Sequence, residues 1–401
     1  MKILLISPFL SGLDSGNGGG VLTFRQIELL VKYHDVSFLS FSGVMSNDIE
    51  ERCSQALSKI CTQVKTVPIT ITRPQIIKAV FRSFLLLNPH LVSLCWLPTM
   101  QKTVREQLAC FKPDLVWIQF PQMAQYVEIC GETPCVMDVQ DAYTLSGFRQ
   151  AQRVHGIGKI RALLDWVCWA RYEAKHYPRF AAVLTLSEQD ATVLHAMSPG
   201  SRTLPIGLPL AEDVPASCEP MPMQVGFAGA FGHRPNIEGL TWFLDDIWPL
   251  VRARLPTAHF VVAGRNPPAK LIARADRGVT FAGFVPSIFD FYASNTVTVV
   301  PMVSGGGVKI KTVEAMLAGS AVVTTQIGAE GTGTTQGQEV LIEDDATRFA
   351  DAVVRILLDS SLRENIANAA RRHSTESFSS DAWLSRVDSI LSKVMRPHAI
   401  A

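Results

Sequence analysis

The chain has 401 residues, which is too long for one compact core and suits two domains of ordinary size. Its 47% hydrophobic and 18% charged residues are typical of a globular protein and exclude an intrinsically disordered chain. The net charge of +1 argues against a nucleic-acid partner, because nucleic-acid binding normally requires a strongly basic surface.

Apolar runs with the length of strands alternate with helical patterns along the whole chain, which indicates parallel α/β units. Five strands are predicted in the first half, at residues 3–7, 36–40, 115–119, 136–139 and 183–187. Five more are predicted in the second half, at residues 225–228, 259–263, 279–281, 296–300 and 321–325. The proline-rich stretch at 202–220 predicts a linker between two domains, with the boundary near residue 210.

The eight cysteines form no Cys-x-x-Cys pair, and most lie in apolar stretches, so we expect reduced core residues. Residues 1–8 predict a first strand and lack the length and cleavage site of a signal peptide. The uncharged run at 83–100 is broken by Asn88 and Pro89, so it does not supply the roughly 20 apolar residues of a spanning helix. We therefore expect a cytoplasmic protein.

Three successive glycines, Gly305, Gly306 and Gly307, follow the predicted strand at 296–300 and precede a helical pattern. Glycines let backbone N–H groups approach a phosphate, and the positive end of the helix dipole favours an anion. Lys309 adds a mobile cation beside this loop. The spacing matches neither the Walker loop nor Gly-x-Gly-x-x-Gly, which argues against an ATPase and a plain dehydrogenase.

Glu314 lies about one and a half turns into the predicted helix, among apolar neighbours. One interpretation is that its carboxylate accepts hydrogen bonds from ribose hydroxyls, as an acidic residue does in dinucleotide sites. The alternative is a pair on the helix surface with Lys311 or Lys309.

The first half holds weaker candidates. Gly18, Gly19 and Gly20 follow Asn17 and precede a predicted helix at 21–33, so they either contact a phosphate or form a flexible turn. Asp141 follows the fourth strand and either orients an acceptor hydroxyl or caps a loop. The histidines show no ligand spacing, so we expect no metal site.

Two segments, 73–87 and 159–171, combine basic and large apolar residues at helical spacing. Basic amphipathic helices that contain Trp can lie in a bilayer interface. Such patterns more often belong to helices that pack on their own sheet. Contact with a membrane or a lipid acceptor is therefore a secondary hypothesis.

The second half resembles the nucleotide-sugar-binding domain of retaining glycosyltransferases of family 4, in a bacterial exopolysaccharide-type subgroup. The resemblance rests on ordered blocks at 227–243, 261–265, 279–285, 307–316 and 328–331. It implies the α/β GT-B fold, with two Rossmann-like domains that face each other across a cleft. The acceptor-side domain is then expected at 1–209, the nucleotide-sugar domain at 210–380, and a C-terminal helix that returns to the first domain at 381–401.

The chain departs from the family pattern at two points. Gly306 stands where the wider family has the first of two glutamates, so only Glu314 of that pair is present. The family's usual Arg and Lys after the first strand of this domain are also missing. Other groups must then meet the diphosphate, and we expect Lys309 first and His233 or Arg234 second.

The resemblance implies a nucleoside diphosphate sugar as donor and no required metal or other cofactor. Asp141 and Lys309 are the candidate catalytic residues. The expected donor-binding residues are Gly18, Gly19, Gly20, Gly305, Gly306, Gly307, Val308, Lys309 and Glu314. The sugar would pass, with retention of configuration, to a hydroxyl of a glycan or lipid-linked acceptor, with peripheral contact to the inner membrane. An inactive GT-B binding subunit and a nucleotide-sugar epimerase are the alternatives.

Overall fold

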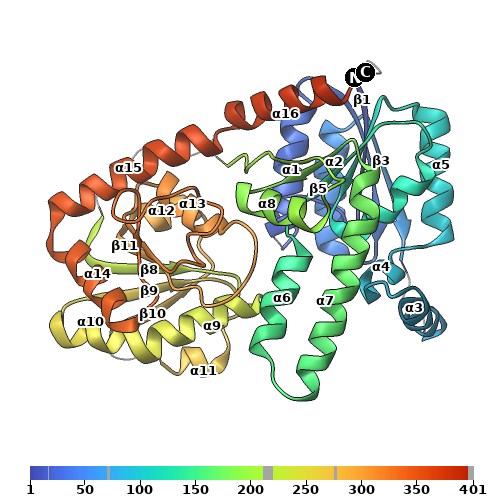
Figure 1. Ribbon diagram of the computed structural model, residues 1–401. Coiled ribbons are helices and arrows are strands. Elements are labelled where there is room, and N and C mark those ends of the chain that lie inside the picture. The colour runs from blue at the N-terminus through green and yellow to red at the C-terminus, as the bar shows by residue number, and fades with distance from the viewer. Residues whose placement is uncertain (17, 70–72, 211–219, 275–277, 396–401) are drawn as a thin grey trace. The chain divides into compact units, whose positions relative to one another are not determined.

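The computed structural model describes the chain except for residues 17, 70–72, 211–219, 275–277 and 396–401. The chain divides into two compact units. Unit 1 comprises Met1–Pro209 and Ser380–Ala401, and unit 2 comprises Leu210–Ser379. Each unit contains one parallel sheet covered by helices (Figure 1).

The sheet of unit 1 has seven strands in the order β3-β2-β1-β4-β5-β6-β7, and every neighbouring pair is parallel. The strands are β1 (Lys2–Ser7), β2 (Asp35–Ser42), β3 (Gln63–Pro68), β4 (Leu115–Gln119), β5 (Cys135–Val139), β6 (Ala182–Thr185) and β7 (Thr203–Pro205). The sequence predicted only five, because the two edge strands are not apolar runs. Four of the six residues of β3 are exposed, and β7 is three residues long and ends in proline.

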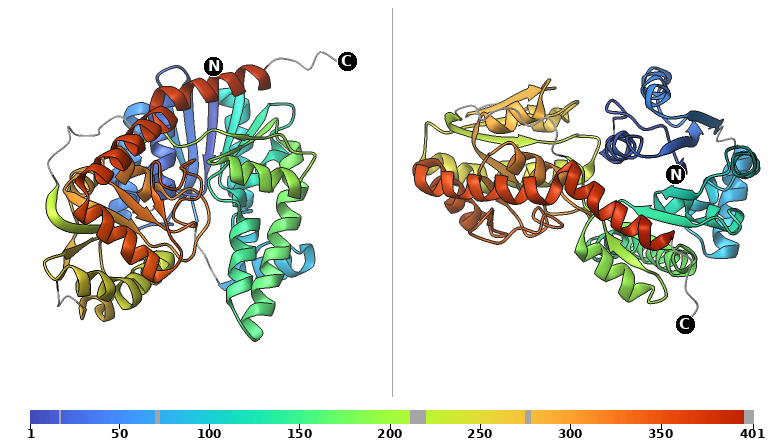
Figure 2. Two further views of the ribbon diagram at one scale, coloured as in Figure 1. Left: turned by 60° about the vertical axis from the view of Figure 1, so that its left-hand side comes forward. Right: turned by 90° about the horizontal axis from the view of Figure 1, so that it is seen from above.

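Helices cover this sheet. They are α1 (Gly18–Leu30), α2 (Asn47–Ile60), α3 (Arg73–Leu86), α4 (His90–Leu94), α5 (Pro98–Phe111), α6 (Tyr143–Arg153), α7 (Ile157–His176), α8 (Glu188–Met197) and α16 (Ser380–Val394), with short 3-10 helices at Pro121–Ile129 and Tyr177–Arg179. α6 and α7 lie side by side as a long hairpin that extends beyond the sheet (Figure 2).

The last helix, α16, completes the core of unit 1. Its buried Trp383 lies in one hydrophobic cluster with residues of β1 and β4, and its ring centroid is 6.5 Å from that of Trp117. Arg386 Nε donates a hydrogen bond of 2.9 Å to the carbonyl oxygen of Ile206. Large aromatic side chains contribute much of the apolar area that a core buries, so α16 is an integral part of this unit.

The sheet of unit 2 has six strands in the order β10-β9-β8-β11-β12-β13, again all parallel. The strands are β8 (Met221–Ala228), β9 (His259–Ala263), β10 (Val279–Gly283), β11 (Asn295–Val300), β12 (Val322–Thr324) and β13 (Leu341–Ile342). The helices are α9 (Arg234–Trp242), α10 (Trp248–Arg254), α11 (Ala269–Ile272), α12 (Ile288–Ala293), α13 (Ile310–Leu317), α14 (Ala346–Leu358) and α15 (Ser360–Phe378), with a π-helical segment at Phe243–Ile247. The sequence missed the two-residue edge strand β13.

In the part of the chain that the structure describes, no helix is long and apolar enough to cross a membrane. The seven described cysteines are free thiols, and four of them are buried: Cys53, Cys95, Cys130 and Cys135. Cys110 is exposed, so the expectation of core positions fails for this residue. Cys218 lies outside the described residues.

The packing of α16 predicts a large loss of stability in Trp383→Ala. The side chain is fully buried, so its removal leaves a cavity beside Trp117, and we expect the free energy of unfolding to fall by about 3–5 kcal/mol. Denaturant unfolding followed by circular dichroism measures this loss. Ser385→Ala, at an exposed position of the same helix, is the control and should change stability by no more than about 0.5 kcal/mol. Equal effects of the two substitutions would contradict the core role of α16.

Candidate functional site

The candidate site lies at the carboxyl ends of β8 and β11, where the strand order of unit 2 reverses. Ligands of open parallel sheets bind at such a point, because the connections leave the two strands in opposite directions. The loop after β8 leads into α9, and the loop after β11 leads into α13. A Cβ atom on Gly239 of α9 would lie 2.5 Å from the carbonyl oxygen of Pro301, so glycine permits α9 to pack against the end of β11.

Backbone conformation explains two glycines of the loop after β11. Gly305 has φ +108° and Gly307 has φ +64°, in the region that side chains with a Cβ rarely adopt. The loop therefore requires glycine at both positions whether or not a ligand is present. Contact of Gly305, Gly306, Gly307 and Val308 with a phosphate stays a prediction.

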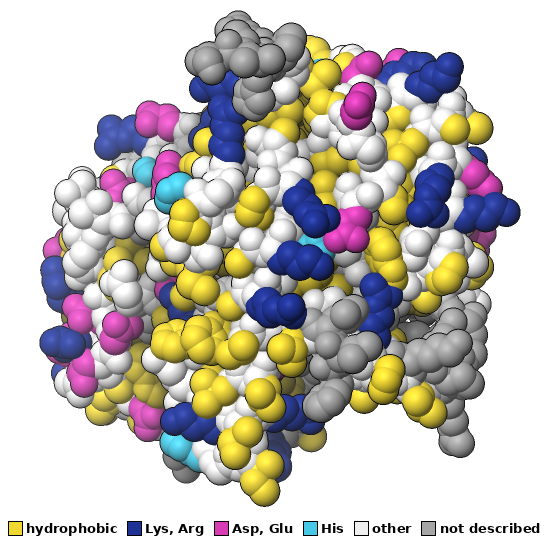
Figure 3. All heavy atoms as spheres, turned by 45° about the vertical axis from the view of Figure 1, so that its right-hand side comes forward, with side chains coloured by type: hydrophobic (Ala, Val, Ile, Leu, Met, Phe, Trp, Pro, Cys, Tyr) yellow, Lys and Arg dark blue, Asp and Glu magenta, His cyan; other side chains and the backbone are white. Residues whose placement is uncertain are grey.

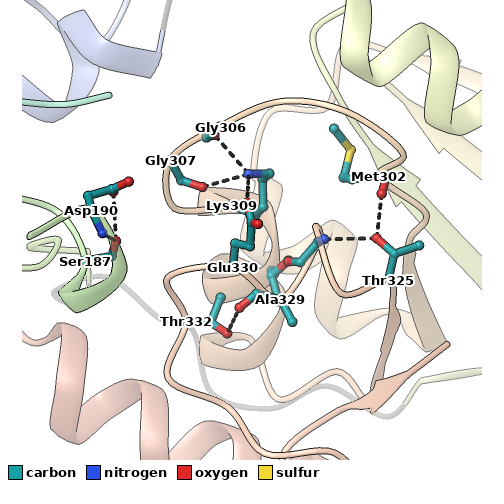
Figure 4. Close-up of polar contacts among 12 residues, drawn as sticks. Ser187, Asp190, Met302, Gly306, Gly307, Lys309, Thr325, Ala329, Glu330 and Thr332 are labelled. Carbon is teal, nitrogen blue, oxygen red and sulfur yellow. Dashed lines mark hydrogen bonds and ion pairs between the residues drawn. The ribbon is translucent and has the colours of Figure 1, made fainter. Parts of the chain in front are cut away.

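Lys309 holds this loop in place. Its Nζ donates to the carbonyl oxygens of Gly306 (2.9 Å) and Gly307 (2.7 Å) and lies 3.6 Å from Glu330 Oε2 (Figure 4). The Lys309 side chain is 7% exposed and that of Glu330 is 12% exposed. The expectation of a mobile cation was wrong, because a buried ammonium must be hydrogen-bonded and paired, and these partners fix it. A direct contact with a diphosphate stays a prediction.

Lys311 is the cation that the sequence analysis did not select as a binding residue. Its Nζ donates a hydrogen bond of 2.5 Å to Asn236 Oδ1 and lies 4.8 Å from the centroid of the Phe227 ring. Burial lowers the pKa of Lys311 to about 7, the Glu314 carboxylate opposes this shift, and Lys309 adds to it. Lys311 thus joins α13 to α9 and to β8 at the centre of the site.

Glu314 lies one turn further along α13, partly buried beside Lys311. Burial raises the pKa of Glu314 to about 7, and the Lys311 ammonium opposes this shift. Burial, with a smaller contribution from Glu314, also raises the pKa of Tyr292 well above its usual value. Glu314 and Lys311 are both partly buried and interact electrostatically, so the alternative of a Glu314–Lys311 pair stays open. The role of Glu314 in ribose binding stays a prediction.

His233 occupies the N-cap position of α9, without a capping hydrogen bond from its side chain, and interacts electrostatically with both lysines. Burial lowers the pKa of His233, and Lys311 and Lys309 lower it further. Arg234 points elsewhere, because its Nε donates to Glu238 Oε1 at 2.6 Å. Ser304 Oγ donates to the other oxygen of Glu238, also at 2.6 Å, and so connects the glycine loop to α9. Of the two second candidates for a diphosphate contact, His233 is the one placed near the lysines.

The site as a whole is suited to an anion. Two lysines and a histidine meet where α9 and α13 begin, and the positive ends of both helix dipoles add to their field. Among the residues that the structure describes, no group of three or more His, Cys, Asp or Glu side chains is arranged to hold a metal ion.

In unit 1 the structure changes the interpretation of Gly18, Gly19 and Gly20. They form the first turn of α1 and not a loop before it, while Asn17 lies outside the described residues. A Cβ atom on Gly19 would lie 2.8 Å from Gln140 Oε1 and from the Phe120 ring. Glycine here lets α1 approach the ends of β4 and β5, and phosphate binding stays a prediction.

A buried polar network connects α1 to the ends of β4 and β5. Gln119 Nε2 donates to Gln26 Oε1 (2.9 Å) and to Asp138 Oδ2 (3.1 Å), and Gln140 Nε2 donates to Thr23 Oγ1 (2.8 Å). Burial raises the pKa of Asp138 to about 7, although its hydrogen bonds oppose the shift. Local spacing does not reveal this network, because its members come from α1, β4, β5 and the loop after β5.

Asp141 lies between β5 and α6, near the buried Glu173 of α7. Burial raises the pKa of Glu173 to about 7, its hydrogen bond from Thr144 opposes this, and Asp141 adds to the increase. Asp141 likewise contributes to the raised pKa of the Tyr143 hydroxyl, for which burial is the main cause. Asp141 thus interacts electrostatically with Glu173 and Tyr143, and its role toward an acceptor stays a prediction.

Comparison with known protein sequences finds one family model and one relative that match parts of this chain. Residues 222–359 match the family model described as glycosyl transferases group 1. A Klebsiella pneumoniae protein described as an uncharacterized 44.6 kDa protein in the cps region is 29% identical over 170 residues, which cover 40% of this chain and 44% of that protein. The match thus spans less than half of that relative. The match to glycosyl transferases group 1 lies within unit 2.

Solved structures cover nearly the whole chain. HepE of Anabaena, in complex with UDP and glucose, has a TM-score of 0.65 at 14% identity, over 98% of this chain and 99% of that one. Sucrose-phosphate synthase of Thermosynechococcus elongatus has a TM-score of 0.68 at 14% identity, with the same coverage. A TarM mutant of S. aureus has a TM-score of 0.66 at 10% identity, over 97% of this chain and 99% of that one. The chain has the GT-B fold, as the resemblance predicted.

The contacts of Lys309 predict energetic coupling with Glu330. Lys309→Met removes an ion pair and two hydrogen bonds to the loop, so we expect unit 2 to lose about 1–3 kcal/mol of stability. In a double-mutant cycle with Glu330→Gln, measured by denaturant unfolding, the coupling free energy should be about 0.5–3 kcal/mol. Lys270→Met, which removes an exposed lysine of α11, is the control for loss of charge. Additive effects of Lys309→Met and Glu330→Gln would contradict the pairing.

Proposed function

We propose that the chain transfers a sugar from a nucleoside diphosphate sugar to a hydroxyl of a glycan or lipid-linked acceptor, in the synthesis of a bacterial surface polysaccharide or glycoconjugate. The observation that carries the proposal is the cationic site at the ends of β8 and β11, which lies within the segment that matches glycosyl transferases group 1. The HepE structure, which contains UDP and glucose, supports this class of donor.

In this proposal the diphosphate binds between α9 and α13. Lys311 and His233 meet it directly, the backbone of Gly305, Gly306, Gly307 and Val308 supplies N–H donors, and Lys309 keeps the loop in shape. Burial lowers the pKa of Lys311 to about 7. A bound diphosphate would raise this pKa again, because a nearby negative charge favours the ammonium form. Glu314 accepts the ribose hydroxyls.

The reaction breaks the bond between the anomeric carbon and the diphosphate oxygen, which leaves with the electron pair. The acceptor oxygen forms the new bond to the anomeric carbon and gives its proton to an oxygen of the departing diphosphate. Cations and helix dipoles that are already in place stabilise the charge on the departing diphosphate, so the proposal needs no metal ion. We further propose that Asp141 orients the acceptor hydroxyl, that Gly18, Gly19 and Gly20 assist donor binding, and that configuration is retained.

The role in surface polysaccharide synthesis is supported by the Klebsiella relative, whose description places it in a cps region. The roles of the two units follow from the same proposal. Unit 2 binds the nucleotide sugar because it holds the cationic site, and unit 1 binds the acceptor.

A second candidate is a binding subunit that has lost activity. Gly306 favours it, because a family glutamate that ordinarily contacts the donor sugar is missing there. This subunit would bind the nucleotide without transferring the sugar. A nucleotide-sugar epimerase, the third alternative, would return an isomerised donor.

Nucleotide binding is the first test. We expect isothermal titration calorimetry in the presence of a chelator to detect binding of UDP or GDP, and Glu314→Ala to weaken it at least tenfold, or about 1.4 kcal/mol. Glu364→Ala, at an exposed position of α15, is the matched control. The donor site is wrong if neither nucleotide binds, or if the two glutamate variants behave alike.

Lys311→Met separates the diphosphate contact from the ribose contact. We expect it to weaken UDP or GDP at least tenfold and to leave the affinity for the corresponding nucleoside unchanged, because only the nucleotide carries the charge that Lys311 meets. Arg355→Met, which removes an exposed cation from α14, should change neither. Equal losses for nucleotide and nucleoside would mean that Lys311 acts on the fold of the site and not on the diphosphate.

Turnover then distinguishes enzyme from binding subunit. Incubation of a bound nucleotide sugar with candidate glycan and lipid-linked acceptors should release nucleoside diphosphate and extend one of them. Nucleotide binding without any consumption of donor would favour the inactive subunit, and an isomerised sugar nucleotide would favour the epimerase.

A further inference from the structure

The N-terminal part of α7 presents an apolar stripe to solvent. Ile157 is 87% exposed, Ile160 61%, Leu164 62% and Val167 49%. The spacings of three, four and three residues place these side chains on one face of the helix. The buried residues of α7 all lie further along, from Trp169 to His176. This half of the helix therefore does not pack on the sheet, and the packing interpretation of segment 159–171 is wrong for it.

The hairpin of α6 and α7 is also basic. Between residues 143 and 171 the sequence has one acidic residue, Asp165, and five basic ones: Arg149, Arg153, Lys159, Arg161 and Arg171. Lys159 and Arg161 are exposed beside the apolar stripe. On the face shown in Figure 3, hydrophobic side chains gather at the lower tip and Lys and Arg side chains lie near them.

Helix α3 of the same unit repeats this combination. Ile77 is 68% exposed, Val80 53% and Phe81 66%. No Asp or Glu occurs between residues 69 and 105, whereas Lys and Arg occur five times. Two separate elements of unit 1 thus combine exposed large apolar side chains with an excess of positive charge.

We propose that the α6–α7 hairpin, assisted by α3, docks unit 1 on a lipid bilayer that contains anionic headgroups. The apolar stripe enters the boundary between headgroups and acyl chains, and the surrounding Lys and Arg side chains contact lipid phosphates. Charge argues for this partner over a second copy of the chain, because two such hairpins facing each other would bring like charges together. Several large apolar side chains exposed close together on one helix face indicate a surface that binds a partner or a membrane.

Docking and donor binding use different residues: the docking helices α3, α6 and α7 belong to unit 1, whereas the cationic site lies in unit 2. The membrane proposal extends the proposed function, because a transferase on a lipid surface meets acceptors anchored in that surface. It does not depend on that function, since an inactive subunit with this hairpin would dock in the same way.

Vesicle co-sedimentation tests the proposal with the full chain. Vesicles of phosphatidylcholine with phosphatidylglycerol should retain the protein, phosphatidylcholine vesicles should retain at least tenfold less, and high salt should release it. Leu164→Glu should reduce the partition coefficient at least tenfold. Leu358→Glu on α14 is the matched control, because Leu358 is also 62% exposed but lies in unit 2. It should bind like the unaltered protein.

Lys159→Glu with Arg161→Glu should lower binding to the anionic vesicles at least tenfold while circular dichroism and nucleotide affinity stay unchanged. Nucleotide affinity measured on every variant separates the two proposals, because loss of vesicle binding alone leaves the donor site intact. Absence of binding to anionic vesicles would overturn membrane docking, as would equal effects of Leu164→Glu and Leu358→Glu. A dimer in light scattering that Leu164→Glu dissociates, without vesicle binding, would assign the stripe to self-association instead.

Discussion

The reversal of strand order between β8 and β11 is the constraint on which the candidate site depends. One connection runs from β8 toward β9 and the other from β11 toward β12, so the loops at the two carboxyl ends diverge and leave room between them. Both loops lead into helices, and both helices direct their positive ends to the same place. Lys311 on α13 then reaches Asn236 on α9, which ties the two sides of this reversal together.

Lys309 is the N-cap residue of α13 and Lys311 lies within the helix, and the two lysines have different surroundings. Lys309 is held by loop carbonyls and Glu330, so its charge is largely neutralised within the protein. Lys311 contacts the neutral amide of Asn236 and the aromatic face of Phe227. It also interacts with the carboxyl group of Glu314, whose pKa burial raises to about 7. A buried ammonium with so little opposing charge favours an anionic ligand, and this is the electrostatic basis of the proposed donor site.

The central strands of both sheets were predictable because they are buried on both faces and are continuous apolar runs. Of the four edge strands, β10 was predicted, whereas β3, β7 and β13 were not, because β3 is mostly exposed and β7 and β13 are only three and two residues long. The glycine loop and Glu314 were found from local spacing, whereas the importance of Lys311 rests on Asn236, which lies 75 residues earlier. The exposure of α7 was equally hidden, because an apolar stripe has the same period whether it faces a sheet or the solvent.

The position of α16 has a consequence for how the chain is made. Unit 1 is discontinuous: residues 380–394 supply Trp383, Val387, Ile390 and Leu391 to a cluster whose other buried members come from the first 206 residues. Unit 2 is one continuous segment. During translation unit 2 can complete its core while unit 1 still lacks one helix, although domains ordinarily fold in the order of their synthesis. Trp117 and its neighbours therefore stay accessible to chaperones until α16 leaves the ribosome.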